Sequence, residues 1–160
     1  MNSLDYAIQI ETDGAGYYRE QASLHTGTSL ERIFNMLAEE EERHKLLLKD
    51  VEENIFSTLP VNDISMKDTL FSGLGQLKDE IRDRVTQLEV YQFARDMEEK
   101  SIALYQELLK NPKDEKERAL LMFIENQERV HADILDELVL RIGRPEEWVE
   151  SAEFGPREEY

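Results

Sequence analysis

The sequence predicts an all-α protein, a four-helix bundle in which two helical hairpins are joined by a long crossover. Apolar residues recur at helical spacing in four long segments, and no segment has a strand pattern. The connections between the segments are short, long and short in that order. A short connection makes two helices antiparallel neighbours, and the long one then lets the two hairpins face each other.

The first hairpin is expected over two helices, at about residues 3–25 and 28–58. Gly27 is a typical residue just past the end of the first helix. Thr28 and Glu31 have the spacing of a capping box, which favours the start of the second helix at this point.

A crossover is predicted over residues 59–85, where proline, glycine and asparagine interrupt the helical spacing. The crossover is expected to contain one or two short helical turns. Thr86 and Glu89 form another possible capping box, so the third helix is expected over about residues 86–110. Asn-Pro follows it and favours its end.

The fourth helix is expected over residues 114–142, with Asp114 as its cap and Gly143 as its stop. A short amphipathic helical tail then follows. We therefore expect one bundle domain over residues 1–143, and a C-terminal tail over residues 144–160 that packs on the bundle or on a neighbouring subunit.

Composition narrows the possible functions. The formal net charge is −17, from 36 acidic and 19 basic residues, so nucleic acid and anionic membranes are not expected partners. The chain has no cysteine, which excludes disulfides and thiolate metal sites within it. No signal-peptide pattern is present, and no apolar run approaches the roughly 18 residues of a membrane span. A cytoplasmic protein is expected.

The first candidate metal-ligating residues form an E-x-x-H motif on the second helix. Glu41 and His44 lie on the stripe that is otherwise apolar, about 60° apart around the helix axis. A shift of 87 positions places them on Glu128 and His131, a second E-x-x-H on the fourth helix. A buried carboxylate beside a buried imidazole is costly unless it is compensated, and a metal ion is the usual compensation.

The same shift relates two inward-facing glutamates on the other two helices. Glu11 falls on Glu98, and each stands 30 positions before the glutamate of its E-x-x-H motif. Each helix of the bundle is thereby expected to point one carboxylate inward. Tyr18 and Tyr105 are related by the same shift and share these inward faces.

Four glutamates and two histidines form a ligand set for two metal ions, in which two glutamates bridge and each ion takes one further Glu and one His. Carboxylate oxygens with imidazole nitrogens suit iron or manganese, and zinc is possible. The alternative is a duplicated bundle whose buried polar residues are only salt-bridged. It is disfavoured because no Lys or Arg repeats on the inward stripe to neutralise the carboxylates.

These motifs resemble the ferritin-like superfamily, and within it the rubrerythrin-type di-iron proteins, over about residues 1–143. The resemblance implies a ferritin-like bundle with two iron ions. It implies that Glu41 and Glu128 bridge the ions, and that Glu11, Glu98, His44 and His131 are terminal ligands. It also matches Tyr18 and Tyr105 to tyrosines that line the site, where a phenol could hydrogen-bond a ligand carboxylate. The alternative for both tyrosines is ordinary core packing.

The sequence departs from that family in two respects. Rubrerythrins carry a rubredoxin domain with Cys-ligated iron, and this chain has no cysteine, so electrons would come from a separate, rubredoxin-like donor. Rubrerythrins also have an extra glutamate one turn after the third-helix ligand, and Ser101 takes that position here. That glutamate is linked in the family to iron movement during peroxide reduction, so its loss puts efficient peroxidase chemistry in doubt.

The leading hypothesis is a di-iron redox enzyme that reduces hydrogen peroxide or dioxygen, as in oxidative-stress defence. The first alternative is a ferroxidase or iron-handling protein, and the second is a non-catalytic metal-binding interaction module. A homodimer is expected, mainly from the resemblance. Two further expectations concern charged residues. His25 is expected to lie at the surface near a helix C-terminus, and three of the four glutamates at 39–42 are expected to be solvated.

Overall fold

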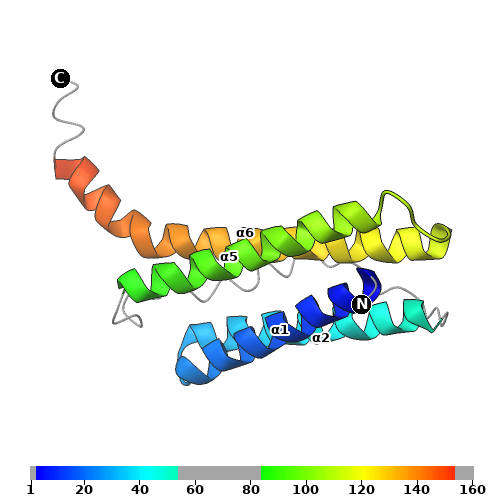
Figure 1. Ribbon diagram of the computed structural model, residues 1–160. Helices are drawn as coiled ribbons and strands as arrows, with labels where there is room; N and C mark the ends of the chain where they lie inside the picture. The colour runs from blue at the N-terminus through cyan, green and yellow to red at the C-terminus, as the bar shows by residue number, and fades with distance from the viewer. Residues whose placement is uncertain (1–2, 54–83, 154–160) are drawn as a thin grey trace.

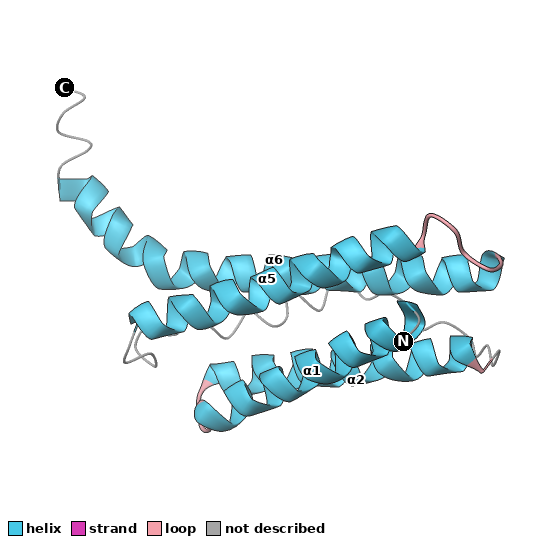
Figure 2. Cartoon of the chain, in the orientation of Figure 1, coloured by secondary structure: helices cyan, strands magenta, loops and turns pink. Residues whose placement is uncertain are grey.

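The computed structural model describes residues 3–53 and 84–153, which form two helical hairpins (Figure 1). Helix α1 packs against α2, and α5 packs against α6. The hairpins lie against each other, with α1 beside α5 and α2 beside α6. Figure 2 shows helices and loops but no strand among the described residues. The all-α four-helix bundle predicted from the sequence is confirmed. The helices are α1 (Ser3–Leu24), α2 (Ser29–Glu52), α5 (Arg84–Leu108) and α6 (Glu115–Glu153).

The apolar core consists of two clusters, one toward each end of the bundle. In every helix the predicted metal ligands fall between the residues of the two clusters, so the polar centre has apolar packing both above and below it. Burial of these side chains supplies the main driving force for the bundle and keeps water away from the centre. One cluster includes Phe34, Leu37, Tyr91, Leu135 and Leu138, and the other includes Ala7, Leu48, Leu121 and Ile124.

The last helix differs from the prediction. We expected it to end near Ile142, but α6 continues past Gly143 and Pro145 to Glu153. A proline inside a helix removes one backbone hydrogen bond and bends the helix without necessarily ending it. Figure 1 shows the C-terminal part of α6, in orange and red, bending away from the bundle. Residues 144–153 of the tail are therefore helical, as expected, but they extend α6 instead of starting a new element.

The predicted helix starts are correct in two cases of three. The backbone N–H of Glu117 donates to Oδ1 of Asp114 at 2.9 Å, so Asp114 caps α6. Thr28 is the N-cap of α2, but its hydroxyl donates to the His25 carbonyl at 2.6 Å, and Glu31 accepts from the N–H of Gly27. Thr86 is not a cap, because α5 already begins at Arg84.

Helix α2 ends at Glu52, six residues before the predicted position. Most of the predicted crossover over residues 59–85 lies outside the described residues.

Candidate metal centre

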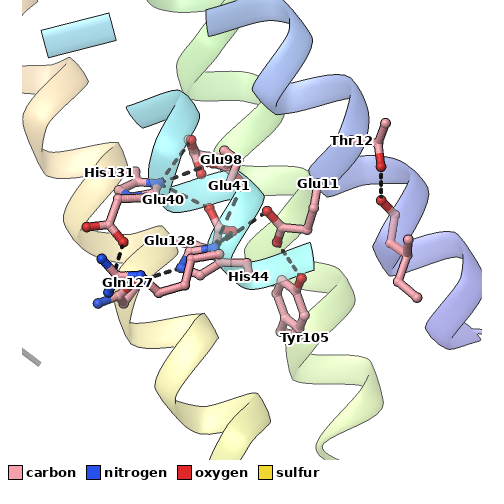
Figure 3. Close-up of polar contacts among 12 residues, drawn as sticks. Glu11, Thr12, Glu40, Glu41, His44, Glu98, Tyr105, Gln127, Glu128 and His131 are labelled. Carbon is pink, nitrogen blue, oxygen red and sulfur yellow. Dashed lines mark hydrogen bonds and ion pairs between the residues drawn. The ribbon is translucent and has the colours of Figure 1, made fainter. Parts of the chain in front are cut away.

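Six side chains from all four helices meet in the middle of the bundle (Figure 3). Each is at most 3 % exposed, so the six side chains are buried within the bundle. The helical spacing explains the convergence, because residues three or four apart share one face and every helix turns that face toward the bundle axis. The six are the predicted ligands Glu11, Glu41, His44, Glu98, Glu128 and His131.

The two halves of the centre are joined by contacts between α2 and α6. The Nδ1 atom of His44 lies 3.1 Å from Oε1 of Glu128, and Nδ1 of His131 lies 3.2 Å from Oε1 of Glu41. Each histidine thus contacts the glutamate of the other motif, as a pseudo-twofold arrangement requires. The two imidazole rings stack with their centroids 5.7 Å apart.

The terminal glutamates approach the same histidine nitrogens. Oε2 of Glu11 is 3.5 Å from Nδ1 of His44, and Oε1 of Glu98 is 3.5 Å from Nδ1 of His131. The geometry therefore assigns one glutamate of α1 to one histidine and one glutamate of α5 to the other.

Ligand atoms from these residues form two groups, each with all of its atoms within 4.8 Å of one another. Glu41 and Glu128 belong to both groups, as bridging carboxylates would. Three buried carboxylate oxygens, one each on Glu11, Glu98 and Glu128, have no hydrogen-bond partner, and those of Glu11 and Glu128 lie 3.5 Å from a histidine Nδ1. Buried polar atoms are normally satisfied, so these oxygens fit a bound cation. The buried cluster therefore suggests a di-metal site.

The electrostatics of the centre separate the carboxylates into two kinds. Burial and the charge of Glu11 raise the pKa of Glu41 well above its usual value, and burial likewise raises that of Glu128. Burial would also raise the pKa of Glu11, but hydrogen bonding with Glu41 and the charge of His44 outweigh it and lower the pKa to about 2. The pKa of Glu98 is lowered too, since hydrogen bonding with Glu128, the charge of His131 and the hydrogen bond from Tyr18 together outweigh burial.

Both histidines hold their protons firmly in the metal-free centre. Burial would lower the pKa of His131, but the charge of Glu98 and the hydrogen bond with Glu128 raise it to about 10. The pKa of His44 is raised well above its usual value, because the charges of Glu11 and Glu128 and the hydrogen bonds with them together outweigh burial. The raised pKa values of the histidines favour imidazolium ions beside the two terminal glutamates, whose pKa values are lowered, and the raised pKa values of the shared glutamates favour their protonated forms.

The tyrosines contact the terminal ligands across the bundle. The hydroxyl of Tyr18 on α1 donates to Oε1 of Glu98 on α5 at 2.6 Å. The hydroxyl of Tyr105 on α5 donates to Oε1 of Glu11 on α1 at 2.5 Å. Each tyrosine therefore holds the carboxylate of the opposite hairpin, which is the arrangement by which outer residues orient metal ligands.

Sequence reasoning missed two buried neighbours of the centre. Oε1 of Gln127 lies 2.7 Å from Nε2 of His44, the ring nitrogen that points away from the cluster. Glu40 was expected to be solvated but is only 4 % exposed. It lies four positions before His44 and so shares that side of α2. The shift of 87 positions relates Glu40 to Gln127, and this relationship could have identified both.

His25 is also less exposed than predicted. Its Nδ1 lies 2.6 Å from the Gln21 carbonyl oxygen, in agreement with the expected role at a helix C-terminus. Its Nε2 lies 2.9 Å from Oε1 of Gln87, and its ring packs against Phe34, so the side chain is half-buried. It takes no part in the metal-ligand cluster.

Comparison with known families shows the family to which the chain belongs. The family model described as Rubrerythrin matches residues 2–139, which include all six ligands. The chain belongs to the rubrerythrin family. Searches of curated proteins and of solved structures give no significant match. Within the family, iron is the typical metal for such a buried Glu/His cluster. In the described residues of this rubrerythrin-family chain, no helix has both the length and the apolar character of a membrane span.

Proposed function

We propose that this rubrerythrin-family protein binds two iron ions and uses them to reduce hydrogen peroxide or dioxygen, in defence against oxidative stress. The observation that carries the proposal is the pair of overlapping ligand groups that share Glu41 and Glu128. A pair of ferrous ions would supply two electrons, the number needed to convert a peroxide to the level of water. Manganese or zinc would fit the same ligands, so iron is part of the proposal.

The residues of the chain have separable roles in this function. Glu41 and Glu128 would hold both ions, and His44 and His131 would each hold one. Tyr18 and Tyr105 fix the orientation of Glu98 and Glu11 through the two cross-bundle hydrogen bonds. The apolar clusters on either side keep water out, which limits side reactions of the reduced site.

Electrons would come from a separate donor of the rubredoxin type, because this chain has no cysteine to hold such an iron itself. We also propose a homodimer. A solution mass by light scattering tests this, and a large multi-subunit shell would instead favour the iron-handling alternative.

The proposal is tested with protein loaded anaerobically with Fe²⁺ and mixed with hydrogen peroxide or with dioxygen. We expect two irons per chain by elemental analysis. We also expect both irons to be oxidised in the same reaction, as monitored by Mössbauer spectroscopy. Glu41→Ala should lose the metal, whereas Glu39→Ala on the exposed side of the same helix should keep it. Protein that binds two irons that neither oxidant oxidises would refute a redox function and favour a structural metal site.

A further inference from the structure

A pocket of about 500 Å³ opens between α1 and α5 and ends at the metal centre. Its inner end is formed by Tyr18, Glu41 and Glu98, that is, by two predicted ligands and the tyrosine that holds one of them. A molecule in the pocket would therefore reach one half of the centre directly.

Gly14 explains why the pocket reaches Glu41. A Cβ atom at this position would lie 3.6 Å from Cδ of Glu41 and 3.8 Å from its Oε2, so any larger side chain would stand over the carboxylate. The repeat-related position on α5 is Ser101, which also lines the pocket. Two small residues thus leave room beside the ligands, one on each wall.

The volume and the walls indicate the kind of ligand. Small-molecule sites typically enclose about 300–1,000 Å³, whereas a water molecule occupies only about 30 Å³ in the liquid. The pocket is thus far larger than hydrogen peroxide or dioxygen requires. Its walls above the ligands are mainly apolar and include Ile10, Met97, Ala103 and Leu104. Such a pocket favours a molecule with an apolar body and one small polar group that meets the centre.

The charged residues at the mouth are one acidic and one basic, so the mouth favours neither sign of charge on a ligand. Asp13 and Lys100 both line the pocket and are exposed, so they offer one negative and one positive group at its entrance. The geometry points to a neutral organic hydroperoxide as the substrate, bound with its carbon body between α1 and α5 and its O–O group at Glu41 and Glu98. This inference rests on the proposed function and specifies its substrate class.

The reaction is balanced by the proposed ferrous pair. The O–O bond of R–O–O–H breaks, and the two oxygen atoms leave as R–OH and water. Two electrons come from the two ferrous ions, which become ferric, and two protons come from solvent water. The alcohol R–OH retains the carbon body, and it is therefore a stable, unreactive probe of the same pocket.

The test measures binding first and reaction second. Cumyl alcohol, the product of cumene hydroperoxide, is titrated by calorimetry into the full-length protein loaded with Zn²⁺. We expect saturable binding that Ala103→Trp weakens at least about tenfold, because the indole would fill the mouth. Ala119→Trp on the exposed side of α6 makes the same change outside the pocket and should leave the affinity unchanged. Ile10→Trp narrows the opposite wall and provides a second variant if Ala103→Trp does not fold, as judged by circular dichroism.

The ferrous protein is then oxidised with cumene hydroperoxide and, separately, with hydrogen peroxide. We expect Ala103→Trp to lower the ratio of the two rates at least about tenfold. The inference is overturned if cumyl alcohol does not bind, if both pocket variants bind it as well as the unmodified protein, or if only hydrogen peroxide oxidises the centre. In those cases the proposed function stands. If neither peroxide oxidises the centre, the inference fails, and if dioxygen does not oxidise it either, the proposed function fails with it.

Discussion

Metal binding should release about four protons from this centre at pH 6. In the metal-free protein the raised pKa values of His44 and His131 favour imidazolium ions, which balance the ionised Glu11 and Glu98, and the raised pKa values of the shared Glu41 and Glu128 favour their protonated forms. As ligands, all four carboxylates must be ionised and both imidazoles must be neutral. Two protons therefore leave the histidines and two leave the shared glutamates. The resulting charge of −4 is balanced by two divalent ions.

This proton release sets the pH dependence of the affinity. Where all four protons are bound, lowering the pH by one unit should reduce the product of the two binding constants about 10⁴-fold. One pKa unit corresponds to about 1.36 kcal/mol, so four protons cost about 5.4 kcal/mol, shared between the two ions. The metal affinity should therefore fall steeply as the pH is lowered, even though carboxylates are ordinary metal ligands.

Anaerobic titration with Fe²⁺ in a pH-stat measures the release directly, as base consumed per two ions bound. Glu41→Gln replaces one titrating carboxyl by a neutral amide, so it should release one proton fewer. Glu39→Gln on the exposed face of α2 should leave the count unchanged. Release of two protons or fewer would refute the reasoning, because the two shared glutamates alone could account for it and the histidines would then be neutral without metal.

Three further predictions follow from the same centre and its packing. The pKa of His131 rises from 6.5 to about 10 on folding. The stability that its protonation adds to the folded protein is therefore fully present below pH 6.5 and is lost toward pH 10. Thermal melts of metal-free protein should show falling stability across that range, and metal-loaded protein should not. Tyr18→Phe removes the hydrogen bond to a ligand and should weaken metal binding about 10–100-fold in competition with a chelator. The hydroxyl of Tyr91 bonds no ligand, so Tyr91→Phe should leave the metal affinity unchanged. Leu37→Ala in the core should cost about 2–5 kcal/mol in denaturant unfolding, against less than about 0.5 kcal/mol for Leu46→Ala, which is 59 % exposed.

The ligand set could be predicted from sequence because it lies on helices. Helical spacing fixes which residues share a face, and the 87-position repeat confirms Glu41 with Glu128 and Glu11 with Glu98 without any knowledge of how the hairpins dock. The hydrogen bonds of the tyrosines could not be predicted in the same way. Whether Tyr18 meets the glutamate of its own hairpin or that of the other depends on how α1 lies beside α5, and this is a property of the packed bundle.

Helix ends were the less predictable part of the fold. Thr86 and Thr28 both have the capping-box spacing, but only Thr28 occupies an N-cap position, because α5 starts two residues before Thr86. Gly143 and Pro145 are strong local stop signals, yet α6 passes through both. Local signals describe a preference of about 1–3 kcal/mol, which the rest of the helix can outweigh.

The internal repeat gives the two halves of the centre equivalent ligands, but the residues around those ligands differ. Each ligand has the same residue type at the position related to it by the 87-residue shift, but some of the neighbouring residues do not. Gly14 leaves Glu41 open to the pocket, whereas its counterpart is Ser101. The neutral Gln127 bonds the outer nitrogen of His44, whereas its counterpart is the acidic Glu40. Because outer residues set the basicity of a ligand and the access to a metal, two ions held by equivalent ligands would differ in potential and in exposure to substrate. The half that includes Glu98 and His131 is therefore the one where a substrate from the pocket would arrive.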